Sequence, residues 1–153
     1  MLNNYVLRSV RYMLDLSDIK MTEVTALGGL TVTQAEMTAW LKKEDDADYQ
    51  EINDNAMGHF LNGLISFRRG KDDSRPDPVI DARLTNNIML KKLRVAFELK
   101  DADLQEIYKN ADFAVSKPEL SALFRNPDHK NYRNCGDQLL RYFLKGLTVR
   151  LRG

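Results

Sequence analysis

The stretch Phe60-Leu61-Asn62-Gly63-Leu64 returns 83 positions later as Phe143-Leu144-Lys145-Gly146-Leu147. Sliding the sequence by this offset aligns residues 3–70 with 86–153 without a gap, and 19 of the 68 aligned pairs are identical. The sequence therefore predicts a tandem duplication. Its three expected parts are a first helical repeat over residues 1–70, a linker over 71–85 and a second helical repeat over 86–153.

Four short helices are expected in each repeat, because apolar residues recur at the three- to four-residue spacing of a helix face. The first helix, over residues 4–15, carries the stripe Val6, Leu7, Val10, Met13 and Leu14. No segment alternates apolar and polar residues as a half-buried strand does. We therefore expect an all-α fold of two four-helix units, in each of which the second and third helices form a helix–turn–helix-like pair.

Short polar side chains mark the expected helix starts, because their oxygens can accept free backbone N–H groups in the first turn. The residues expected to cap the first and second helices of the repeats are Asn3, Asn86, Asp18 and Asp101. Capping boxes are expected at the third helix, in Thr33–Glu36 and Ser116–Glu119. The fourth helices begin near Asp54 and Asp137.

Gly63 and Gly146 lie inside the fourth helix of their repeats. Glycine costs about 1 kcal/mol relative to alanine at such a position. Its presence in both copies therefore predicts a close crossing with another helix.

Several longer strings make the chain resemble the YehS-like family of small bacterial proteins. These strings are Trp40–Asp45, Phe60–Ile65, Arg69–Asp72, Pro127–Asn131, Cys135–Gln138 and Leu140–Leu144. The resemblance covers nearly the whole chain and implies a duplicated domain. It carries over no catalytic residues, because the family is one of unknown function.

Composition favours a soluble protein. The chain has 153 residues, of which 43% are apolar, and this is enough to bury a core. No apolar run approaches the roughly 20 residues of a membrane-spanning helix. The first residues lack the pattern of a signal peptide, and a lone cysteine, Cys135, fits a reducing compartment. We expect a cytoplasmic protein that does not contact membranes.

The two repeats differ in charge. Residues 3–70 hold 7 Lys and Arg against 10 Asp and Glu, which gives −3, whereas residues 86–153 hold 13 against 8, which gives +5. Such a split can serve nucleic-acid contact, contact between the halves or head-to-tail assembly, and it can equally arise by drift on solvated surfaces.

Motifs for catalysis are weak. The two histidines, His59 and His129, align with Tyr142 and Asp46 and so do not recur. His59 is expected to be a partly buried structural residue. A nucleophile pair of Cys135 with His129 is allowed by their spacing but not indicated by it. The acidic loop at Glu44–Asp48 lacks the glycine and the ligand spacing of a calcium loop. Neither a metal nor a cofactor is expected.

Polar residues that recur in both copies are more informative. The pairs are Arg11 and Arg94, Glu23 and Glu106, Glu36 and Glu119, Asp45 and Asp128, Tyr49 and Tyr132, and Arg69 and Arg152. A structural interpretation makes them ion pairs, helix caps and a loop in which the aspartate accepts backbone N–H groups while the tyrosine packs. The functional interpretation is one binding site per repeat. Its candidate residues are Asp45, Tyr49, Asp128, Tyr132, Arg11 and Arg94.

Nucleic-acid binding is the alternative function. The helix–turn–helix-like pair can place a helix in a major groove, although its link, residues 28–32, is longer than the tight turn of the DNA-binding form. The basic second repeat can contact phosphates without reading sequence. The candidate contacts are Lys91, Lys92, Lys117, Arg125, Lys130 and Arg133.

The leading hypothesis is a non-enzymatic module that binds another macromolecule, a protein rather than a nucleic acid. An enzyme without a recognisable motif ranks third, and a deep pocket lined by Cys135, His129 and Asp128 would support it. Oligomeric state is left open by the sequence.

Overall fold

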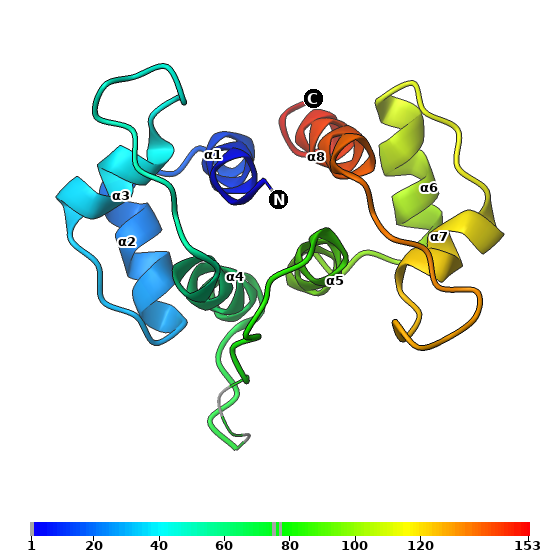
Figure 1. Ribbon diagram of the computed structural model, residues 1–153, viewed down its shortest axis with the longest axis horizontal. Helices are drawn as coiled ribbons and strands as arrows, with labels where there is room; N and C mark the ends of the chain where they lie inside the picture. The colour runs from blue at the N-terminus through cyan, green and yellow to red at the C-terminus, as the bar shows by residue number, and fades with distance from the viewer. Residues whose placement is uncertain (1, 75, 77) are drawn as a thin grey trace. The chain divides into compact units, whose positions relative to one another are not determined.

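A computed structural model describes residues 2–74, 76 and 78–153. Throughout these residues every regular element is a helix, as the sequence predicted. The chain divides into two compact units, Leu2–Leu84 and Thr85–Gly153 (Figure 1). Each unit contains four helices in the same order, so the predicted tandem repeat of a four-helix unit is confirmed.

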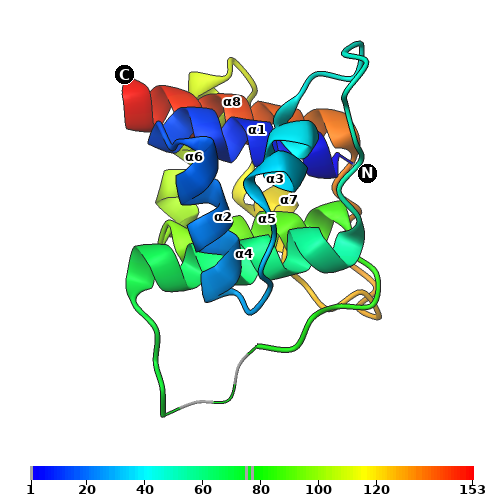
Figure 2. The same cartoon turned by 90° about the vertical axis from the view of Figure 1, so that its left-hand side faces the viewer.

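The helices of the first unit are α1 (Asn3–Leu14), α2 (Asp18–Leu27), α3 (Gln34–Leu41) and α4 (Asp54–Arg69). Those of the second are α5 (Asn86–Ala96), α6 (Asp101–Asn110), α7 (Lys117–Leu123) and α8 (Asp137–Arg152). The most extensive packing is between α2 and α4 and between α6 and α8. Figure 2 shows α2 running steeply across α4. No described helix combines the length and the apolar character needed to cross a membrane.

The predicted caps are right for the third helices and wrong for the first and second. Thr33 and Ser116 both form complete capping boxes. The residues that precede the first and second helices are Leu2, Ser17, Thr85 and Lys100. Asn3, Asn86, Asp18 and Asp101 are instead the first helical residues. Their side chains point to other parts of the unit and make longer-range contacts, described below.

Glycine allows the fourth helix of each unit to touch the second backbone to backbone. A Cβ atom on Gly63 would overlap the carbonyl oxygen of Val24 in α2, and one on Gly28 would overlap that of His59 in α4. In the second unit a Cβ atom on Gly146 would overlap the carbonyl oxygen of Ile107. The close crossing predicted from the recurrence of glycine is therefore confirmed in both units.

The segment that follows α4 packs back onto the first unit. Leu84 is only 1% exposed, and its N–H donates to Oδ2 of Asp54 at 3.2 Å. A methyl carbon of Ile80 lies 3.2 Å from the position that a Cβ atom on Gly58 would occupy. Part of the segment expected to be a linker is thus included in the compact first unit.

Candidate interaction site in the repeated interhelical loops

The loop between the third and fourth helices has the same backbone conformation in both units. Residues 42–53 form it in the first unit, and residues 124–136 form it in the second (teal and orange in Figure 1). Three backbone hydrogen bonds recur at equivalent positions. In the first unit they join Asp46 N to Lys43 O, Tyr49 N to Asp46 O and Gln50 N to Ala39 O. In the second unit they join His129 N to Asn126 O, Tyr132 N to His129 O and Arg133 N to Ala122 O. All six bonds are 2.9 to 3.2 Å long.

One asparagine of the first helix holds the loop in each unit. In the first unit, Nδ2 of Asn4 donates to the carbonyl oxygens of Trp40 at 3.0 Å and Gln50 at 2.9 Å. Its Oδ1 accepts from the N–H of Ile52 at 3.2 Å. One side chain thereby satisfies three backbone groups on both flanks of the loop.

Asn87 makes the same three contacts in the second unit. Its Nδ2 donates to the carbonyl oxygens of Leu123 at 3.0 Å and Arg133 at 2.8 Å, and its Oδ1 accepts from the N–H of Cys135 at 2.8 Å.

The preceding asparagine extends this connection to the start of the fourth helix. Asn3 donates to the carbonyl oxygen of Ile52 at 3.2 Å and to Oδ1 of Asp54 at 2.9 Å. Asn86 makes the equivalent bonds to Cys135 at 3.0 Å and Asp137 at 2.8 Å. The two asparagines of each unit are called the Asn clamp below. Sequence reasoning missed this role, although the repeated Asn-Asn dipeptide was the available signal.

Recurring Arg11 and Arg94 join the first helix to the second. Arg11 pairs with Asp18 at 3.2 Å, and Arg94 pairs with Asp101 at 2.9 Å. Arg94 also stacks its guanidinium over the ring of Phe124 at 4.7 Å. These contacts account for both arginines within the fold.

The recurring glutamates also have partners inside their own units. Glu23 pairs with Lys20 at 3.1 Å, and Glu106 pairs with Arg150 at 3.5 Å. Glu36 completes the capping box with Thr33.

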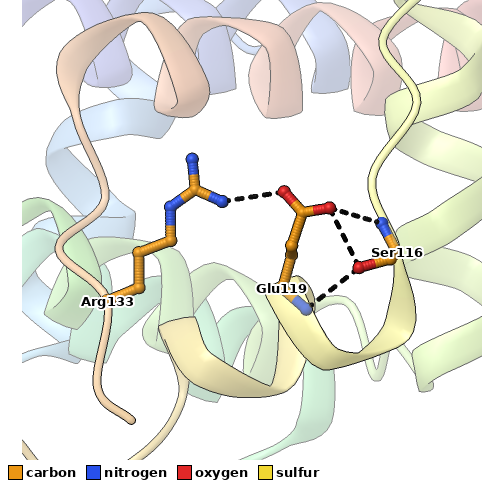
Figure 3. A network of polar contacts seen from close by, with 3 residues as sticks. All are labelled: Ser116, Glu119 and Arg133. Atoms are coloured by element: carbon orange, nitrogen blue, oxygen red, sulfur yellow. Dashed lines mark hydrogen bonds and ion pairs between the residues drawn. The ribbon is translucent and has the colours of Figure 1, made fainter.

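Glu119 has an ion-pair partner in addition to its capping box, as Figure 3 shows. It accepts from Ser116 and also pairs with Arg133 at 3.0 Å. The hydrogen bonds from Ser116, with the charge of Arg133, lower the pKa of Glu119.

Asp45 and Asp128 are exposed, and the tyrosines that recur with them are half-buried. Among the residues that the structure describes, none of these four side chains makes a hydrogen bond or an ion pair. The prediction that the recurring aspartate accepts backbone N–H groups is wrong. The side chain that accepts the N–H group of the turn belongs instead to the next residue, Asp46 in the first loop and His129 in the second. Oδ1 of Asp46 accepts from Asp48 at 2.8 Å, and Nδ1 of the equivalent His129 accepts from Asn131 at 3.0 Å.

The environment of Tyr49 keeps its phenol neutral. Desolvation raises the pKa of Tyr49, and the nearby charges of Glu44 and Glu51 raise it further. The ring therefore offers an apolar face and a hydroxyl donor on the same loop as the exposed carboxylate of Asp45.

The basic candidates fall into two groups. Arg125, Lys130 and Arg133 lie together on the second loop, where all three are exposed. Lys91 and Lys92 lie on α5, and Lys117 is the first residue of α7. The third helices are short, because α3 ends at Leu41 and α7 ends at Leu123. Lys42, Lys43 and Arg125 therefore belong to loops.

His59 has the structural role that the sequence predicted. It is half-buried, and its Nδ1 lies 2.7 Å from the carbonyl oxygen of Gly28 at the end of α2. The equivalent Tyr142 stacks on Phe113 with ring centroids 4.7 Å apart.

Cys135 and His129 have separate surroundings. Cys135 is 5% exposed, whereas His129 is exposed and lies beside Arg125. Burial raises the pKa of Cys135 to about 12, so the thiol has little nucleophilic thiolate near neutral pH. Across the described ranges, no group of three or more His, Cys, Asp or Glu side chains is placed to hold a metal ion.

The Cys135 thiol is expected to resist alkylation in the folded protein. We expect iodoacetamide at pH 8 to label it at least about 100-fold more slowly than in the urea-unfolded chain, because thiolate formation and access are both suppressed. Mass spectrometry of timed samples measures this ratio. Equal rates in the two states would show that the thiol is accessible and reactive.

Comparison with known proteins agrees with this repeat structure. The model of a protein family of unknown function, DUF1456, matches twice, over residues 3–70 and 86–153. The chain belongs to this family. It is also 49% identical over 150 residues to the uncharacterized protein YehS of Escherichia coli (strain K12), covering 98% of this chain and 96% of that protein. No solved structure matches the chain. Each of the two family matches spans one set of four helices and includes one copy of the Asn clamp and its loop.

Proposed function

We propose that this member of the DUF1456 family is a non-enzymatic cytoplasmic module that binds a protein through its two repeated loops. The observation that carries the proposal is the contrast among the recurring polar residues. The arginines, glutamates and asparagines are engaged within the fold, whereas Asp45 with Tyr49, and Asp128 with Tyr132, keep side chains without polar partners among the described residues. Residues retained in both copies without such a partner are the best candidates for external contact.

The geometry of the loops supports this role. The Asn clamp and the shared turn fix the loop backbone from within the unit, so that little loop entropy is lost on binding. Each loop combines a charged group with a tyrosine that is already partly fixed by burial. Tyrosine is among the residues that contribute most to protein interfaces.

A protein partner fits these loops better than a nucleic acid does. α3 carries no lysine or arginine, and α7 carries only Lys117 at its first position. The recurring exposed group of both loops is a carboxylate, which repels phosphates. On the basic loop, the charge of Arg133 is balanced by Glu119.

Removing the recurring carboxylates is expected to weaken partner binding strongly. The tagged full-length chain and its Asp45→Ala/Asp128→Ala variant are compared as baits in nuclease-treated bacterial lysate, with quantitative mass spectrometry of captured proteins. We expect the specific partner to fall at least about tenfold, as for loss of a central interface contact. Asp73→Ala is the matched control, because it removes an exposed carboxylate outside the loops.

Two outcomes would contradict the proposal. One is that no specific protein is captured while the purified chain turns over a small molecule. The other is duplex DNA binding that persists in the aspartate variant, falls steeply with salt and weakens with Lys91→Glu/Lys92→Glu. That second result would establish the nucleic-acid alternative.

A further inference from the structure

The two loops share one shape but carry opposite charge. Positions 42–51 hold two lysines and five acidic residues, which gives −3. The equivalent positions 125–134 hold three basic residues and one aspartate, which gives +2 with His129 neutral. The recurring turn bonds and the Asn clamp are nevertheless the same in both. The duplication has therefore produced two loops of equivalent backbone geometry and complementary charge in one chain.

The charges that differ are available for contact. Glu44, Asp45 and Asp48 are exposed on the first loop, while Asp46 holds the turn. Arg125 and Lys130 are exposed on the second loop, while Arg133 is held by Glu119. Each loop thus exposes at least two charges of one sign, and Arg125 also contacts Nε2 of His129 at 3.5 Å within its own loop.

We propose that the partner bound by these loops is a second copy of this chain, with the acidic loop of one molecule docking on the basic loop of the next. This inference rests on the proposed function of the loops and names their partner. Complementary surfaces on one chain are always present at equal concentration, and opposite charges both attract and orient the two molecules. Because the surfaces differ, the contact is heterologous and adds molecules head to tail.

The position of the tyrosines fits such a contact. Tyr49 and Tyr132 occupy equivalent places in the two loops, each half-buried beside the exposed charges. Docking places an aromatic ring from each partner near the centre of the contact, where excluding water strengthens the surrounding ion pairs.

Two neutralising variants test the inference with the full chain. The first, Glu44→Gln/Asp45→Asn, disables the acidic loop, and the second, Arg125→Gln/Lys130→Gln, disables the basic loop. All four side chains are exposed. Arg125 contacts Nε2 of His129 at 3.5 Å, but the bonds that hold the turns are made by the backbone, by Asp46 and by Nδ1 of His129, so both variants are expected to keep the circular dichroism of the parent.

Sedimentation velocity then measures assembly between about 10 μM and 1 mM, the range of weak contacts. The parent is expected to form species that grow with concentration at about 0.01 M salt and dissociate at about 1 M salt, where screening is short-ranged. Each variant alone is expected to remain monomeric. An equimolar mixture should form a dimer that grows no further, because it has one working contact and two disabled ends.

Three results would overturn the inference: a parent that stays monomeric throughout, variants that assemble like the parent, or a mixture that forms species larger than a dimer. A monomeric parent that still captures a partner sensitive to Asp45→Ala/Asp128→Ala would overturn this inference alone. A parent that stays monomeric and also captures no partner sensitive to Asp45→Ala/Asp128→Ala would overturn the proposed function as well.

Discussion

Gly146→Ala is expected to lower the free energy of unfolding of the second unit by about 3 kcal/mol, near the upper end of the range for overpacked sites. The new methyl group would overlap the carbonyl oxygen of Ile107, and this backbone atom cannot rotate away. The helices must therefore separate, and this cost exceeds the roughly 1 kcal/mol that alanine gains in helix propensity. Urea unfolding monitored by circular dichroism measures the change, and hydrogen exchange locates it in α6 and α8.

Gly136→Asn is the matched control, because no atom lies within 4 Å of the position of its Cβ atom. The equivalent residue of the first unit is Asn53, whose Oδ1 accepts from the N–H of Ala56 at 2.8 Å. Asparagine at position 136 can make the same cap for α8. We expect a gain of a few tenths of a kcal/mol. A Gly146→Ala chain as stable as the parent would contradict the close crossing.

Asn4→Ala is expected to cost the first unit about 3 kcal/mol, because it leaves three backbone groups without their partner. Loss of the clamp should also release the loop, so that amides of residues 42–52 exchange faster than those of α4. Trp40 is the only tryptophan, and its carbonyl oxygen is one of the released groups. Its fluorescence during urea unfolding therefore reports the affected unit directly.

Asn55→Ala provides the control for this substitution. Asn55 is exposed on α4, and we expect a change within about 0.5 kcal/mol, as for other surface positions. If Asn4→Ala and Asn55→Ala had equal effects, the clamp would contribute nothing to the stability of the loop.

Much of the fold could be predicted because its determinants are local or repeated. Helix-spaced apolar residues predict α1 to α8, and the capping box at Thr33 needs only residues three positions apart. The recurrence of Gly63 as Gly146 predicted the close crossing, since a costly residue kept in both copies needs a common reason.

Other features depended on contacts between residues far apart in the sequence. Asn4 binds Gln50, which is 46 positions away, and at the start of a helix the same residue type is an equally good local cap. Only the folded unit distinguishes these roles. The turn acceptors were missed for another reason, because Asp46 and His129 look unrelated yet offer an acceptor atom at the same place.

The candidate site could be predicted in part. Recurrence singled out Asp45, Tyr49, Asp128 and Tyr132, but also Arg11 and Arg94, because it selects structural and external contacts alike. Only the three-dimensional partners separate the two classes. The charge difference between the repeats was evident from composition, whereas its concentration on loops of one shape required the structure.

Leu84 and Ile80 make the first unit depend on residues that the ribosome adds after its last helix is complete. Domains generally fold as units, N-terminal first, as the nascent chain emerges. A chain interrupted after Gly70 would hold four helices with one side of α4 uncovered. Residues 80–84, which cover that side, are added to the chain just before α5. The first unit thus has all of its residues outside the ribosome before the second unit has, and this order favours packing within the first unit over exchange of helices between two such similar sequences.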